Sequence, residues 1–252
     1  MSTCRSSDGR GQSNPIALVL IFALVIGATT VVLVVGGLAI QGSQDQLDMA
    51  SAEKAMTQLD SQVSLVALGQ SRSQTVELSA TGSNPYKASS TAGSMNVTFT
   101  YWNGTQGASW EADMGEIVYE GNNRGRVAYQ GGGVWRSGEG GGTTMVSPPE
   151  LRYDSGTLTL PLVTISNDSS LSDDVIIRQS PEKRQFASKN VTNPLEGGSV
   201  TVNVTSDYAD GWESYLRSRT RGVVNRTGER TVEMTLTVDI EQEFENAIAV
   251  TD

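Results

Sequence analysis

The chain has 252 residues, a net charge of −10 and a sequence pI of about 4.6. It contains no histidine and a single cysteine, Cys4. This composition excludes Ser-His-Asp and Cys-His catalysis, histidine ligation of metals and disulfide bonds within the chain. Nucleic acid needs a basic footprint on its partner, so this acidic chain with four lysines is not expected to bind it.

An apolar run from Pro15 to Ile40 dominates the N-terminal part, and no charged residue occurs between Arg10 and Asp45. As a helix this run would be roughly 39 Å long, which is enough to cross a bilayer of about 30 Å. Basic residues precede the run, whereas the first charges after it are acidic. The positive-inside rule therefore predicts a single-pass membrane protein with a cytoplasmic N-terminus and an extracellular C-terminal domain.

The residues in front of the run, Arg10-Gly11-Gln12, resemble the class III leader of archaeal type IV pilins and archaellins. In that family a prepilin-type peptidase cuts on the cytoplasmic side, and the apolar helix stays in the mature protein. Carried over to this chain, the resemblance implies cleavage between Gly11 and Gln12. The chain departs from bacterial-type pilins, which have a glutamate at mature position five, where it has Ile16. An uncut signal anchor is the alternative.

The stretch after the run continues as an amphipathic helix that ends near Gly69. Six apolar residues recur at spacings of three and four, which predicts one buried helix face. This helix stripe consists of Met49, Ala52, Met56, Leu59, Val63 and Val66. Asp60 falls outside the stripe. One helix over 15–68 and two helices separated by a hinge near Gly42 both fit the sequence.

From Ser71 onward the sequence shows patterns of period two, which are typical of half-buried antiparallel strands. Strands are expected over 75–79, 95–102, 116–119, 126–130, 157–166, 175–179, 199–205 and 231–240. Gly131–Gly133 predicts a hairpin turn, Pro161 an edge strand or a bulge, and residues 208–220 a helix.

The predicted fold class is α+β. A long N-terminal transmembrane and amphipathic helix is followed by a mainly antiparallel β domain with one inserted helix. The corresponding domains are a basic leader (1–11), cut after Gly11, a transmembrane helix (12–42), an amphipathic helical extension (43–69) and an extracytoplasmic β-rich domain (70–252).

Six Asn-x-Ser/Thr triplets, which are acceptors for N-linked glycans, all fall in the predicted outer domain. They begin at Asn96, Asn103, Asn167, Asn190, Asn203 and Asn225. Asn96 and Asn203 alternate with apolar neighbours, so both are expected on the solvent face of their strands. A β domain rich in Ser and Thr also produces such triplets by chance.

The sequence contains neither a P-loop nor an EF-hand loop, and no cofactor or metal is expected. Carboxylate pairs such as Glu111 and Asp113 could serve glycoside hydrolysis, but any acidic protein contains such pairs. Tryptophans are expected in the core rather than on a sugar-binding platform. They are Trp102, Trp110, Trp135 and Trp212.

Several internal segments, among them 60–69, 127–135, 145–150 and 158–163, are similar to segments of haloarchaeal pilin-like membrane proteins of unassigned function. The resemblance implies a place in the archaeal cell envelope and a halophilic source. It also implies a prepilin-type peptidase and other pilin-like subunits as partners, but it carries no activity.

The sequence therefore predicts a non-enzymatic envelope protein, a pilin-like subunit such as a minor pilin or an archaellin-like protein. Its helices over 16–68 would bundle side by side, and Gly27, Ala28, Gly36 and Gly37 would allow close approach within the bilayer. Two alternatives remain open: a monomeric, signal-anchored extracellular binding module, and an envelope glycan hydrolase that uses a carboxylate pair.

Overall fold

The computed structural model describes residues 14–78, 84–122, 125–138, 140–154, 157–171, 174–179, 198–238 and 249–250. The chain divides into two compact units, Met1–Gln46 and Leu47–Asp252. The helices are α1 (Asn14–Ala67) and α2 (Ala209–Arg219). The strands are β1 (Ser73–Glu77), β2 (Tyr86–Ser89), β3 (Ser94–Tyr101), β4 (Gln106–Asp113), β5 (Glu116–Glu120), β6 (Arg126–Gln130), β7 (Gly133–Ser137), β8 (Thr143–Ser147), β9 (Arg152–Asp154), β10 (Thr157–Thr159), β11 (Leu162–Val163), β12 (Ser169–Leu171), β13 (Asp174–Arg178), β14 (Gly198–Thr205), β15 (Val223–Arg226), β16 (Thr231–Val238) and β17 (Ala249–Val250).

The first unit holds the N-terminal part of α1, in which side chains are described over residues 17–33 and 44–46. Its large apolar side chains from Leu18 to Leu33 are 49–75% exposed. Over the described residues, no helix reaches the length and apolarity that crossing a membrane demands. The helical assignment of α1 includes Gly42, which favours the one-helix alternative.

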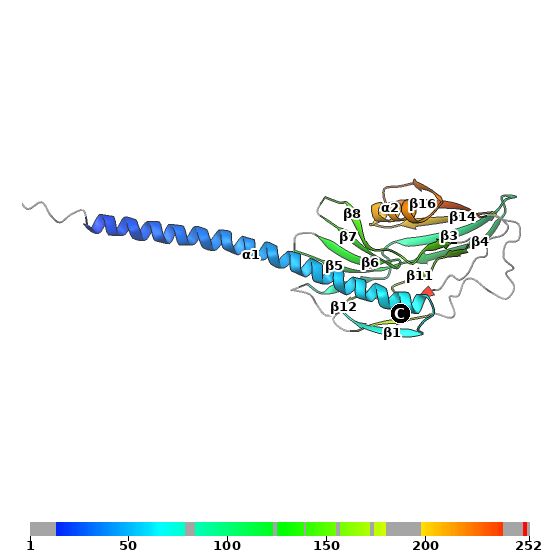
Figure 1. Ribbon diagram of the computed structural model, residues 1–252, viewed down its shortest axis with the longest axis horizontal. Coiled ribbons are helices and arrows are strands. Elements are labelled where there is room, and N and C mark those ends of the chain that lie inside the picture. The colour runs from blue at the N-terminus through cyan, green and yellow to red at the C-terminus, as the bar shows by residue number, and fades with distance from the viewer. Residues whose placement is uncertain are drawn as a thin grey trace, which may run out of the picture. The chain divides into compact units, whose positions relative to one another are not determined.

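In the second unit, a six-stranded antiparallel sheet of order β12-β2-β5-β6-β7-β8 lies between two covering layers (Figure 1). Residues Leu47–Ala67 of α1 cover one face, and α2 with a five-stranded sheet covers the other. Successive side chains of a strand point to opposite faces. Ile117 and Tyr129 therefore join the core under α1, whereas their neighbours Val118 and Ala128 join the core under α2.

The five-stranded sheet has the order β15-β16-β14-β3-β4, and all of its pairs are antiparallel. Along β14 every second residue is buried, for example Val202 at 0% exposed. Trp212 of α2 packs against Trp135 of β7, with ring centroids 4.9 Å apart. The second core is therefore formed by both sheets and α2 together.

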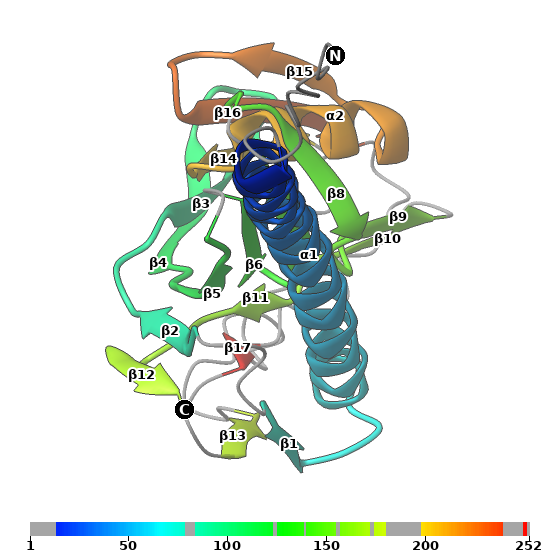
Figure 2. The same cartoon turned by 90° about the vertical axis from the view of Figure 1, so that its left-hand side faces the viewer.

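Three short strand pairs complete the described part of the second unit. β1 pairs with β13 and β9 with β10, both antiparallel, and β11 pairs with β17 in parallel. The pair β1–β13 lies side by side in Figure 2.

The α+β class and the mainly antiparallel pairing are confirmed. Gly131 and Gly132, with φ of 59° and 83°, form the predicted turn between β6 and β7. The strand expected over 157–166 is instead two short strands, β10 and β11, separated at Pro161, because proline has no N–H to donate to a ladder. Strand β4 was not expected, since few of its residues are apolar.

Candidate functional site

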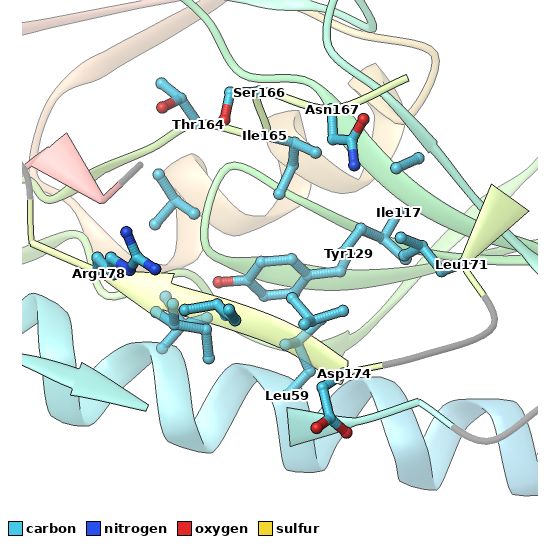
Figure 3. A pocket seen from close by; sticks show the side chains of 16 residues that line it. Leu59, Ile117, Tyr129, Thr164, Ile165, Ser166, Asn167, Leu171, Asp174 and Arg178 are labelled. Carbon is cyan, nitrogen blue, oxygen red and sulfur yellow. The ribbon is translucent and has the colours of Figure 1, made fainter. Parts of the chain in front are cut away.

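A cavity of about 320 Å³ lies between α1 and the six-stranded sheet in the second unit (Figure 3). Its wall is largely apolar and includes Leu59 of α1, Ile117 of β5, Ile177 of β13 and Ile165 from the loop after β11. Polar side chains also line it: Asn167, Asp174 and Arg178. Small-molecule sites are commonly apolar cavities of this size with a few polar groups.

Tyr129 of β6 forms the aromatic part of this wall. Figure 3 shows its ring at the centre of the lining residues, with the hydroxyl turned toward the side where Arg178 lies. Tyr129 is 1% exposed, and its hydroxyl has no hydrogen-bond partner among the described residues. Burial raises the pKa of Tyr129 well above its ordinary value, and the negative charges of Asp60 and Glu150 raise it further. The hydroxyl therefore stays protonated and keeps one unused donor.

Two hydrogen bonds between side chains join α1 to β8 and to the segment that follows β8. Ser147 donates a hydrogen bond of 2.5 Å to Asp60, and Ser64 donates one of 2.8 Å to Glu150. Asp60 is 6% exposed, and its second carboxylate oxygen has no partner within the described part of the chain. Burial raises the pKa of Asp60 to about 7; the bond from Ser147 opposes this shift, and the charge of Glu150 adds to it.

Two further contacts hold α1, one from the six-stranded sheet and one from the residue that follows β13. Arg136 of β7 lies 2.5 Å from Glu53 in an ion pair. Gln179 donates a 2.8 Å hydrogen bond to the carbonyl oxygen of Val66. The last carbonyls of a helix have no partner within the helix. The Val66 carbonyl accepts the Gly69 N–H at 3.1 Å, and Gln179 adds a second donor from outside the helix.

The helix stripe predicted from the sequence is buried in full. Its six members are 0–8% exposed and belong to the core between α1 and the six-stranded sheet. This face is therefore not free to bundle with a second helix, contrary to the expectation for residues 16–68. Asp60, expected outside the stripe, is buried as well, since it follows Met56 by four residues and precedes Val63 by three.

The predicted processing residues and the small residues of the membrane helix all belong to the first unit. Arg10, Gly11 and Gln12 fall outside the described residues. Gly27 and Ala28 lie on α1, where a Cβ added at Gly27 would meet nothing within 4 Å and Ala28 is exposed. The pair Gly36–Gly37 belongs to α1 as well.

Three of the Asn-x-Ser/Thr triplets (sequons) have their asparagines in one row across the five-stranded sheet. Asn203 of β14 pairs directly with Asn96 of β3 on one side and with Glu233 of β16 on the other. Asn225 of β15 also pairs with Glu233. These residues alternate with core residues and face away from the core. The other sequons are apart from this row: Asn103 lies in the β3–β4 turn, Asn167 is exposed before β12, and Asn190 falls outside the described residues.

The tryptophans divide between core and surface. Trp135 and Trp212 are fully buried, and Trp110 is half-buried against the second core. Trp102 is 57% exposed, so the expectation of a core position is wrong for it. The physical reason is that β3 ends at Tyr101, and Trp102 already lies in the following turn.

The carboxylate pair Glu111 and Asp113 is exposed on β4 and does not line the cavity. The described residues contain no group of three or more His, Cys, Asp or Glu side chains that could hold a metal ion. The candidate site is therefore an apolar cavity lined by Tyr129, whose hydroxyl is buried, and next to α1, which carries the buried carboxyl group of Asp60.

A family model described as a family of unknown function, DUF7289, matches residues 10–251. The chain belongs to this family. The DUF7289 match begins at Arg10 and thus includes both the apolar run and the β-rich unit. Among curated proteins and among solved structures, nothing matches the chain.

Proposed function

We propose that this protein is a pilin-like subunit of the cell envelope, anchored by the apolar part of α1, with its β-rich unit outside the cell. The proposal rests on the separation of the apolar run from the hydrophobic cores. Among the described residues, both cores contain only residues from Met49 onward. The uncharged run over 15–40 precedes them and directly follows the leader-like Arg10-Gly11-Gln12.

The exposed side chains of the first unit support an apolar environment for this segment. Eleven large apolar side chains between Leu18 and Leu33 are 49–75% exposed. A continuous apolar surface of this extent is rare on a monomeric soluble protein and marks contact with a membrane or with other protein. A helix satisfies its own backbone hydrogen bonds, so it can enter lipid without further partners.

Contacts between subunits would use the same segment. The stripe over 49–66 is already covered by the chain's own sheet, so it leaves no apolar face for a second helix. Gly27 and Ala28, with Gly36 and Gly37 two to three turns later, provide small residues at which helices could approach closely. The proposed partners are the membrane, a prepilin-type peptidase and other pilin-like subunits.

A single-cysteine crosslinking experiment tests the proposal. In a Cys4→Ser background, Ala28→Cys places the only thiol on the proposed helix contact, and Lys54→Cys places it on an exposed position of α1 in the second unit. Full-length protein in archaeal membranes should crosslink through position 28 and not through position 54. A protein that leaves the membrane in alkaline carbonate, or that crosslinks at neither position, would contradict the proposal.

A monomeric, signal-anchored binding module is the second candidate, and the cavity beside Tyr129 favours it. This reading requires no contact between copies, so membrane retention without any crosslink at position 28 would support it over the pilin-like subunit.

A further inference from the structure

The hairpin between β3 and β4 carries a sequon at its tip. The Gly104 N–H donates to the Tyr101 carbonyl, and the Tyr101 N–H donates to the Thr105 carbonyl, both at 2.9 Å. Gly104 has a φ of 80°. These bonds define a three-residue loop, Trp102 to Gly104, in which a turn is followed by a glycine in the left-handed conformation. Asn103 is the middle residue of this loop.

The folded loop leaves the reactive groups of the sequon accessible. Asn103 and Thr105 are both exposed. The Thr105 N–H donates to the side-chain carbonyl oxygen of Asn103 at 2.8 Å. This bond uses the Thr105 backbone and the Asn103 oxygen, so it occupies neither the Asn103 amide nitrogen nor the Thr105 hydroxyl. A Cβ added at Gly104 would meet nothing within 4 Å, so the space around the loop is open.

The paired sequons at Asn96 and Asn203 are less exposed than Asn103. Both lie half-buried in the interior of the sheet, directly opposite each other. Thr98, the hydroxyl residue of the first sequon, donates to the Asn96 side-chain oxygen at 3.0 Å. Directly opposed residues have Cβ atoms about 4.5–5.5 Å apart, so a sugar on either asparagine would lie over the other.

Two aromatic residues directly precede Asn103 in the chain. Trp102, the preceding residue, is 57% exposed, although its neighbours along β3 alternate into the core. Tyr101 is half-buried and packs edge-on against Phe99, with ring centroids 4.8 Å apart. An exposed indole ring is an apolar surface with one polar N–H. A pyranose ring, which is apolar on one face, can pack on such a surface.

We propose that Asn103 is the acceptor of an N-linked oligosaccharide whose first sugar packs on Trp102. The donor class is a lipid-linked oligosaccharide phosphate or diphosphate. In the transfer, the bond between the anomeric carbon and the phosphate oxygen breaks, and a bond forms from that carbon to the Asn103 amide nitrogen. The amide loses one proton to a base of the transferase, and the phosphate leaves on its lipid. The inference rests on the proposed outward location of the β-rich unit.

Glycopeptide mass spectrometry of full-length protein from an archaeal host with N-glycosylation machinery tests the site. The peptide with Asn103 should carry the glycan on most molecules. Asn103→Gln and Thr105→Ala should each remove that mass, whereas Thr105→Ser should retain it. An unmodified Asn103 overturns the proposal, whether or not other sequons are occupied.

Protease accessibility of the same intact cells separates this failure from failure of the proposed function. An unmodified Asn103 on a protease-accessible β unit contradicts only the glycan site. A β unit protected inside the cell contradicts the proposed location and the glycan site together.

Thermal unfolding tests the contact with Trp102. Glycosylated wild type should melt roughly 2–4 °C above Asn103→Gln. In a Trp102→Ser background, the same glycan should change the melting temperature by less than about 1 °C. An equal glycan effect in both backgrounds would overturn the proposed packing on Trp102.

Discussion

Ser147 of β8 donates a 2.5 Å hydrogen bond to Asp60 of α1, at the border of a helix face that is otherwise apolar. The bond fixes the helix against the sheet, but it also buries a carboxyl group of which only one oxygen has a partner among the described residues. The protonation of Asp60 therefore adds a pH-dependent contribution to the attachment of α1, which the apolar stripe also holds on the sheet.

The contribution of Asp60 to the stability of the second unit should fall as pH rises from about 4 to 7. Burial raises the pKa of Asp60 from 3.8 to about 7, so the folded chain holds this proton more tightly than the unfolded chain. The resulting stabilisation is fully present below the unfolded pKa and is lost as pH rises through the folded pKa. Asp60→Asn should lack this dependence. Between pH 4 and 7, the free energy of unfolding of this variant should rise by up to about 4 kcal/mol relative to that of wild type. Urea unfolding of the full-length protein measures this difference. A difference that is constant with pH would contradict the assignment.

A buried and an exposed leucine of α1 should differ strongly in their contribution to stability. Leu59 is 1% exposed in the core under α1, whereas Leu47 is 67% exposed. Leu59→Ala should lower the free energy of unfolding by about 2–5 kcal/mol, because it leaves a cavity. Leu47→Ala should change it by less than about 0.5 kcal/mol. Chemical denaturation of both variants checks the prediction, and equal losses would show that this face of α1 is not the buried one.

Removing a tyrosine hydroxyl should have opposite consequences at two buried positions. The Tyr129 hydroxyl has no partner among the described residues, so Tyr129→Phe should be neutral or stabilise the fold by about 1 kcal/mol. The Tyr215 hydroxyl donates toward the carbonyl oxygens of Pro149 and Leu151 at 2.6 and 2.7 Å. Tyr215→Phe should therefore cost about 1–3 kcal/mol in the same unfolding assay. Destabilisation by Tyr129→Phe would reveal a partner for that hydroxyl, such as a bound ligand or water.

Alanine should be tolerated at one turn glycine and not at another. Gly131 and Gly104 both have positive φ, 59° and 80°. A Cβ at Gly131 would lie 2.7 Å from the Met114 sulfur and 2.8 Å from the Trp212 ring, whereas one at Gly104 would meet nothing within 4 Å. Gly104→Ala should cost about 1–2 kcal/mol for the left-handed backbone alone, and Gly131→Ala at least about 1–3 kcal/mol more for the overpacking. Thermal unfolding of the two variants measures the difference, and similar losses would contradict the close contact at Gly131.

Elements with a regular apolar period were predictable from the sequence. The stripe from Met49 to Val66 follows helical spacing, and the strands β3, β14 and β16 follow the alternation of two, so local pattern alone located them. Strand β4 was not predicted because its only apolar residues are Trp110 and two alanines. Its position is set by pairing with β3. Asp60 could have been placed on the buried face, since 56, 60 and 63 share helical spacing.

The candidate site could not be predicted in the same way. Tyr129 meets α1 only because β6 is an inner strand of a sheet whose order, β2-β5-β6-β7, does not appear in local sequence. Likewise, Asn96 and Asn203 are more than a hundred residues apart, and only the pairing of β3 with β14 makes them neighbours. Such relationships depend on topology, which local periodicity does not specify.

The first residue of the mature protein tests the proposed envelope role most directly. Peptide mass spectrometry of the membrane fraction should identify Gln12 as the N-terminus, because prepilin-type processing would cut after Gly11 and leave the apolar helix in place. A mature chain that begins at Met1 or Ser2 would contradict pilin-like processing and would favour a simple signal-anchored binding module.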